Sequence, residues 1–186
     1  SPRLALRTGA VKPPFIPTRE EELLGSMFAT HLGPQDNPGD FVPSPNWPFV
    51  APGAWGAANA LSPRHVAEAV PRLLAAQPKP PVLWVRGSHD LAVGDTSLSC
   101  PGTLGSLGAI PGWRPGGGAP VGEPRGGGGG GLPPPQPMVS QTRAVLEKYA
   151  AAGGRYQEVV IQDAGHVPFI EKPDEYNAVF HAHLTS

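Results

Sequence analysis

Two residues capable of acid–base chemistry each follow a short apolar segment of the chain. Asp90 comes shortly after the run Val82–Val85, and His166 comes shortly after the run Val159–Ile161. Short continuous apolar runs bounded by turn residues are typical of fully buried strands. In open α/β sheets, ligands and catalytic groups lie at the carboxyl ends of the parallel strands. We therefore expect Asp90 and His166 to lie within hydrogen-bonding distance of each other.

In such a pair, each residue would have a distinct chemical role. The Asp90 carboxylate would accept the Nδ1 proton of His166, fix the tautomer of the ring and stabilise the imidazolium. His166 would act as a general base near neutral pH. Two alternatives stay open: Asp90 could merely cap its own loop, and Asp95 could be the acid instead. We prefer Asp90 because it is closer to the end of the strand, where its position is better controlled.

A nucleophile does not accompany this pair. An acid followed later by a histidine is the second half of the chain order Ser…Asp…His. The sequence has no Gly-x-Ser-x-Gly; Ser106 lies in a run that is one residue short and follows no strand. Cys100 precedes Pro101 in a predicted loop, without the helix terminus or neighbouring base that activates a thiol. The nucleophile is therefore expected to be absent from these residues.

The remaining histidines lack a comparable setting, and the sequence predicts neither a metal nor a cofactor. His181 and His183 are two residues apart, which is the wrong spacing for one face of a helix, and the single cysteine forms no cluster. His89 adjoins the acid, but its side chain should point elsewhere. His31 and His65 fall outside both strand ends.

Composition excludes several classes of function. The formal net charge is −1 with no basic block, so a nucleic-acid partner is not expected. No apolar run reaches the roughly 18 residues of a membrane span. The single cysteine rules out an internal disulfide framework and favours a reducing, cytoplasmic location.

The elements that must position the pair form an α/β pattern. Strands are predicted at Pro81–Val85 and Tyr156–Ile161, and a βαβ arrangement makes them parallel. Residues 1–17 should be extended or should cover the core, and residues 34–56 should be irregular, since both are rich in proline. Helices are predicted over Thr18–Leu32, from Ser62 with an interruption at Pro71, over Pro137–Ala152, and from Pro173 onward.

Two segments are unusual in composition. Gly and Pro number 25 and 26 of 186 residues, and much of the excess falls in residues 114–136, which we predict to be a disordered insertion. The irregular segment 34–56 carries Trp47, Phe49 and Trp55. These aromatic residues either anchor the loop or line a cavity for a small apolar substrate.

Three stretches together resemble the C-terminal part of the α/β-hydrolase family. Pro80–Asp90 is similar to the family's seventh strand and acid turn, Asp163–Pro168 to its histidine loop, and Glu171–Tyr176 to the start of its last helix. The resemblance implies a partial α/β-hydrolase fold, with a helical and irregular cap in residues 1–78 and the C-terminal core in residues 79–186. It also implies Asp90 as acid and His166 as base, serving a Ser, Asp or Cys nucleophile.

The function that the resemblance implies is hydrolysis of small apolar esters, epoxides or similar bonds. The first six strands and the nucleophile turn of the family are missing, and the chain begins with Ser1, so we expect a fragment. Without neighbouring strands, the exposed sheet edge should favour association with another chain. The alternatives are a non-catalytic interaction protein and an incomplete gene product without activity.

Overall fold

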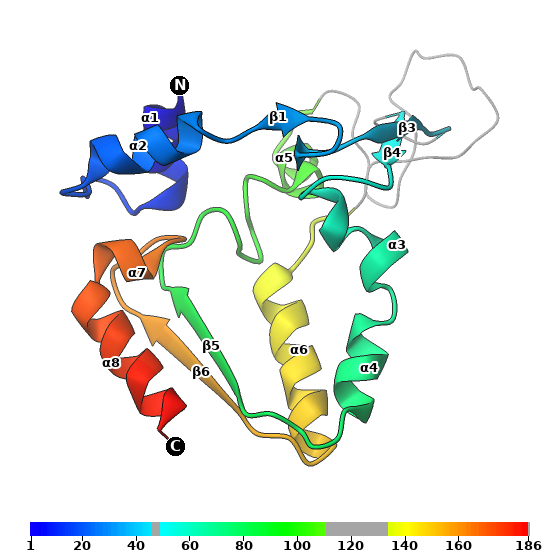
Figure 1. Ribbon diagram of the computed structural model, residues 1–186, viewed down its shortest axis with the longest axis vertical. Helices are drawn as coiled ribbons and strands as arrows, with labels where there is room; N and C mark the ends of the chain where they lie inside the picture. The colour runs from blue at the N-terminus through cyan, green and yellow to red at the C-terminus, as the bar shows by residue number, and fades with distance from the viewer. Residues whose placement is uncertain (46–48, 111–133, 186) are drawn as a thin grey trace. The chain divides into compact units, whose positions relative to one another are not determined.

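The computed structural model describes residues 1–45, 49–110 and 134–185 (Figure 1). The chain divides into two compact units. The first, here called the strand-pair unit, comprises Ser1–Phe28, Leu74–Ser97 and Pro137–Ser186, and the second, the hairpin unit, comprises Ala29–Leu73 and Leu98–Gln136. This division runs differently from the regions 1–78 and 79–186 expected from the sequence. Most of the predicted insertion at 114–136 lies outside the described residues.

The strand-pair unit is built on two parallel strands, as predicted. β5 (Val82–Gly87) pairs with β6 (Tyr156–Ile161), with Val82 opposite Tyr156 and Gly87 opposite Ile161. The in-register pairing brings both carboxyl ends to one edge. An α/β architecture is thus present, and each sheet in the described residues has two strands.

Two helices flank this strand pair, α6 (Met138–Ala151) and α8 (Pro173–Leu184), and they lie on opposite sides of it (Figure 1). Both were predicted from their apolar periodicity. Tyr149 of α6 is fully buried and donates its hydroxyl to the Pro80 carbonyl at 2.5 Å. This contact fixes α6 beside the start of β5. The short helix α7 (Pro168–Glu171) lies between His166 and α8.

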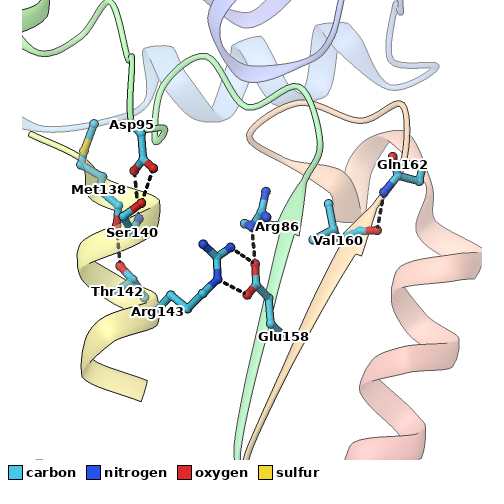
Figure 2. A network of polar contacts seen from close by, with 9 residues as sticks. All are labelled: Arg86, Asp95, Met138, Ser140, Thr142, Arg143, Glu158, Val160 and Gln162. Atoms are coloured by element: carbon cyan, nitrogen blue, oxygen red, sulfur yellow. Dashed lines mark hydrogen bonds and ion pairs between the residues drawn. The ribbon is translucent and has the colours of Figure 1, made fainter. Parts of the chain in front are cut away.

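Ion pairs between side chains connect the strand pair to α6 (Figure 2). Arg86 donates its Nε–H to Glu158 Oε1 at 2.8 Å, and Arg143 donates to both Glu158 oxygens at 2.8 and 2.9 Å. Hydrogen bonds from Arg143 and Arg86 hold the pKa of Glu158 below its ordinary value, although burial opposes the shift. One carboxylate therefore joins β5, β6 and α6.

The N-terminal segment differs in part from the prediction. Residues 1–17 were expected to be extended or to cover the core; α1 (Pro2–Ala5) and a π-helical turn (Leu6–Ala10) form there, so they are not extended, while Leu6 and Val11 do pack in an apolar core. Pro2 stands at the first helical position, where its missing N–H costs nothing. Ser1 caps this helix by accepting the Leu4 N–H at 3.4 Å.

Helix α2 (Glu20–Phe28) follows and ends earlier than the predicted Leu32. Its Glu20 binds Arg7 through two 2.6 Å hydrogen bonds, which attach the π-helical turn to the helix. A small apolar core joins these elements to the loop that carries His166; its members are Leu6, Val11 and Leu24, with Ala10, Phe15, Leu23 and Val167 packed against them.

The hairpin unit corrects the prediction that residues 34–56 form no regular element. β3 (Phe41–Pro43) and β4 (Val50–Pro52) pair antiparallel, and β1 (Leu32–Gly33) and β2 (Asn37–Pro38) pair parallel. Asp40 stabilises the fold of this segment, because its carboxylate accepts the N–H groups of Ala54 and Trp55 at 3.1 and 2.7 Å. Proline content had suggested a loop, and side chain–backbone bonds of this kind have no periodic signature.

The remaining helices, between residues 59 and 106, are short. A 3₁₀ turn (Asn59–Leu61) precedes α3 (Pro63–Val66) and α4 (Ala69–Ala75), and α5 (Pro101–Ser106) follows β5 along the chain. The predicted interruption occurs before Pro71 rather than at it, because a proline in the first turn of a helix needs no N–H partner. Within the described residues, no helix combines the length and apolar character needed to cross a membrane.

Candidate active site

Asp90 and His166 meet at the carboxyl ends of β5 and β6, as predicted. His166 Nδ1 lies 2.9 Å from Asp90 Oδ2, with the Asp90 side chain 9% exposed and the His166 side chain 43% exposed. An ionised carboxylate only accepts hydrogen bonds, so Nδ1 carries the proton in this contact. In the neutral ring, Nε2 then has a free lone pair. This is the arrangement of an oriented general base.

Asp90 also caps its own loop, so its carboxylate makes both the loop contacts and the contact with His166. Its second oxygen, Oδ1, accepts the N–H groups of Ala92 and Val93 at 2.8 Å each. The two backbone bonds fix the carboxylate plane, which leaves Oδ2 directed at the imidazole.

Asp95, the alternative acid, is engaged elsewhere. It accepts the Ser140 N–H at 2.9 Å and the Ser140 hydroxyl at 2.5 Å, at the start of α6 (Figure 2). These hydrogen bonds lower the pKa of Asp95 from its ordinary value. The carboxylate therefore caps a helix and compensates the N–H groups exposed at its first turn. The structure assigns the contact with His166 to Asp90.

The two loops at this edge approach closely because Gly87 has no side chain. A Cβ at Gly87 would lie 2.0 Å from the Gly165 carbonyl oxygen and 2.3 Å from that of Ala164. Backbone bonds from Ser88 N–H to the Ile161 carbonyl and from His89 N–H to the Ala164 carbonyl, at 3.0 and 2.9 Å, continue the strand pairing into the loops. The tight approach therefore requires glycine at position 87.

Gly165 lies where the histidine loop meets the N-terminal segment. The non-glycine residue of this loop with left-handed backbone is Asp163, with φ of 58°. A Cβ at Gly165 would lie 2.7 Å from the Lys12 nitrogen and 2.9 Å from the Ala10 carbonyl oxygen. The N-terminal segment therefore packs against the backbone of the histidine loop.

A second histidine at this edge makes its own contact. His89 Nδ1 lies 2.8 Å from Ser88 Oγ, and that hydroxyl also accepts the Asp163 N–H at 2.9 Å. Ser88 thus ties the acid loop to the histidine loop and also contacts the ring of His89. Sequence reasoning missed Ser88, although the run Gly87–Asp90 placed a hydroxyl beside both ionisable groups.

The two weaker nucleophile candidates lie in the hairpin unit. Cys100 is buried and free, and it caps α5 instead of lying in the predicted loop. Burial raises the pKa of its thiol, but hydrogen bonds from Thr103 and Gln136 outweigh burial, so the pKa lies below its ordinary value. Ser106 donates its hydroxyl to the Thr103 carbonyl within the helix at 2.8 Å.

The aromatic residues proposed to line a substrate cavity also belong to the hairpin unit. Phe49 and Trp55 are 56% and 64% exposed, and Trp47 lies outside the described residues. Two cavities occur in the strand-pair unit, of about 280 and 410 Å³, and neither is lined by Asp90 or His166. In the part of the chain that the structure describes, no group of three or more His, Cys, Asp or Glu side chains could hold a metal ion.

Comparison with known proteins gives no relative for this chain. No family model, no curated protein and no solved structure matches it. The interpretation of the site therefore depends on its own geometry.

Proposed function

We propose that this chain supplies the acid and the base of a hydrolase of the α/β-hydrolase type, acting on small apolar esters, epoxides or similar bonds. The observation that carries the proposal is the contact between Asp90 Oδ2 and His166 Nδ1 at the carboxyl ends of two parallel strands. An acid and a histidine held in this way serve a nucleophile in many unrelated hydrolases.

In this mechanism, Nε2 of His166 removes the proton of a Ser or Cys nucleophile, or of the water that releases an aspartyl ester. The imidazolium that forms is stabilised by Asp90 and returns the proton to the leaving group. The nucleophile would come from outside the described residues. Asp90 holds its position through the bonds from Ala92 and Val93, so the ring does not have to reorient during the proton transfer.

The tautomer of His166 tests this proposal. Ring ¹⁵N shifts of the folded protein at neutral pH should show His166 with its proton on Nδ1. Asp90→Asn, whose side chain can donate as well as accept, should give a mixture of tautomers. Asp174→Asn, which changes an exposed carboxylate at the start of α8, is the matched control. An Asp90→Asn spectrum equal to that of the unchanged protein would contradict the assigned roles.

A chemical readout uses the same variants. An apolar chloromethyl ketone should alkylate His166 Nε2, forming an N–C bond as chloride leaves, and mass spectrometry of peptides would locate the product. The rate should fall on the order of tenfold in Asp90→Asn because Nε2 then carries the proton more often. Equal labelling of His166 and the helix α8 residue His181 would argue against an activated base.

A second function has support of its own. Several large apolar side chains of the hairpin unit are exposed, which is typical of protein–protein contact surfaces; they are Phe41, Val42, Phe49, Val50 and Trp55. A non-catalytic interaction protein could use this surface. Retention of partner binding after His166→Ala, with loss after Trp55→Ala, would favour this alternative over the hydrolase.

A further inference from the structure

Glu171 is a buried carboxylate in the strand-pair unit, and it holds the histidine loop through the backbone. Glu171 is 7% exposed, and each of its carboxylate oxygens accepts one backbone N–H. Oε2 accepts the Gly165 N–H at 2.6 Å, and Oε1 accepts the Lys12 N–H at 2.8 Å. Gly165 directly precedes His166, so this bond acts on the backbone that carries the imidazole.

The second partner belongs to a segment far away in the sequence. Ala10–Lys12, here called the N-terminal arm, also accepts the Val167 N–H at the Ala10 carbonyl, at 3.2 Å. Lys12 Nζ lies 2.6 Å from Asp163 Oδ1. The arm therefore contacts the chain on both sides of His166, and Glu171 joins the arm to the loop between these contacts.

A carboxylate is required chemically at this position. Two N–H donors converge on one side chain, and only an ionised carboxylate offers an acceptor at both oxygens. A glutamine would place an NH₂ group against one of the donors and leave a buried N–H unsatisfied. Such a loss is expensive, because the desolvated donor has no water to replace its partner.

We propose that Glu171 is a positioning residue for His166, and that the N-terminal arm completes the site in which it acts. This positioning role rests on the proposed function, in which His166 is the base. The contacts of Glu171 are with backbone N–H groups and not with the imidazole. It acts by keeping the loop where Nδ1 reaches Asp90.

The test compares Glu171→Gln with a matched control. Glu175→Gln removes an exposed carboxylate four residues later. In Glu171→Gln, amide hydrogen exchange at Gly165 or Lys12 should quicken on the order of 10- to 100-fold. The His166 ring should also shift to mixed tautomers, and its alkylation by the chloromethyl ketone should slow. The control should change none of these.

The outcomes separate this inference from the proposed function. If Asp90→Asn alters the tautomer of His166 and Glu171→Gln does not, the positioning role is wrong and the acid–base pair stands. If Asp90→Asn has no effect, the proposed function fails first. If Glu171→Gln gives no folded spectrum, Glu171→Asp replaces it, because it keeps both acceptors on a side chain one methylene shorter; unchanged exchange and tautomer there would also overturn the role.

Discussion

At the scale of single residues, the site depends on carboxylates that each make more than one bond. Asp90 fixes its own loop with one oxygen and orients His166 with the other, so neither task competes with the other. Asp95, five residues later, has both oxygens committed to Ser140. The two acids differ in role because of their hydrogen-bond partners rather than their chemistry.

Gly87 offers a residue-scale prediction. Gly87→Ala should lower the free energy of unfolding by about 1–3 kcal/mol, because the new Cβ must displace the histidine loop. It should also slow alkylation of His166, since the loop moves away from Asp90. Urea unfolding followed by circular dichroism measures the first effect, and peptide mass spectrometry the second.

A matched glycine in helix α2 provides the control. Gly25 has nothing within 4 Å of an added Cβ. Gly25→Ala should therefore raise stability by up to about 1 kcal/mol, because alanine favours the helix. Equal effects at Gly87 and Gly25 would show that the close approach of the two loops is not needed.

At the scale of elements, the βαβ unit is fastened by Glu158 as well as by strand pairing. The carboxylate receives Arg86 from β5 and Arg143 from α6, so three elements meet at one group. Removing it would leave two partly buried guanidinium groups without their acceptor, which costs more than losing the attraction alone.

The pH dependence of stability should reveal this network. The pKa of Glu158 is lower in the folded chain than its ordinary value of 4.5, so protons bind the unfolded chain first as the pH falls. The contribution of Glu158 to the free energy of unfolding is therefore fully present at neutral pH and declines below about pH 5. Glu158→Gln should be less stable by about 1.5–3 kcal/mol at pH 7, and its stability should decline less between pH 5 and 3.

Urea unfolding at pH 7, 5 and 3 measures this difference. Glu175→Gln serves as control, because it removes an exposed carboxylate and should leave the pH profile nearly parallel to that of the unchanged protein. Parallel profiles for Glu158→Gln as well would mean that the three elements do not depend on this carboxylate.

At the scale of the whole molecule, the strand pair is a very small sheet. Among the described residues, β5 pairs with β6 alone, and the β5 residues Leu83, Trp84 and Val85 line a cavity of about 410 Å³ together with α8 side chains. Parallel strands are usually flanked by further strands. A strand edge left unpaired is a template for another chain.

We expect copies of this chain to associate through the unpaired strand edge. Sedimentation velocity should show a concentration-dependent fraction of dimers or larger species. Leu83→Lys should reduce it, because a charge on an edge strand opposes pairing. Leu61→Lys, at an exposed apolar position of the hairpin unit, should not. A monomer at all concentrations, with cooperative unfolding, would identify a self-sufficient domain.

Turnover is also a property of the whole molecule. The isolated chain should hydrolyse small p-nitrophenyl esters and styrene oxide no faster than its His166→Ala variant. A base without a nucleophile and an oxyanion donor lacks most of the catalytic stabilisation, since one such donor is commonly worth about 10²–10³ in rate. Activity that His166→Ala abolishes would reveal a nucleophile in this chain, and Ser88→Ala would be the first variant to examine.

Local sequence patterns specify the strands and helices that frame the site. Continuous apolar runs specified β5 and β6, and apolar periodicity specified α6 and α8, because these patterns repeat over neighbouring residues. The convergence of Asp90 and His166 also followed, since parallel strands place their carboxyl ends at the same edge. The secondary structure of the proline-rich segments was harder to predict. α1 and the β3–β4 pair were missed because the contacts that stabilise them are not periodic in the sequence.

Tertiary structure alone decided which groups hold the pair in place. In the folded chain, Asp90 and not Asp95 contacts His166. The loops approach closely at Gly87 and Gly165. The Lys12 N–H also bonds to Glu171, which is 159 positions away in the sequence. Such contacts join residues that share no local pattern, and each depends on the path of a loop fixed by backbone hydrogen bonds elsewhere. For that reason, the contact between Asp90 and His166 could be predicted from the chain, whereas the bonds from Glu171 to the histidine loop are seen only once the chain has folded.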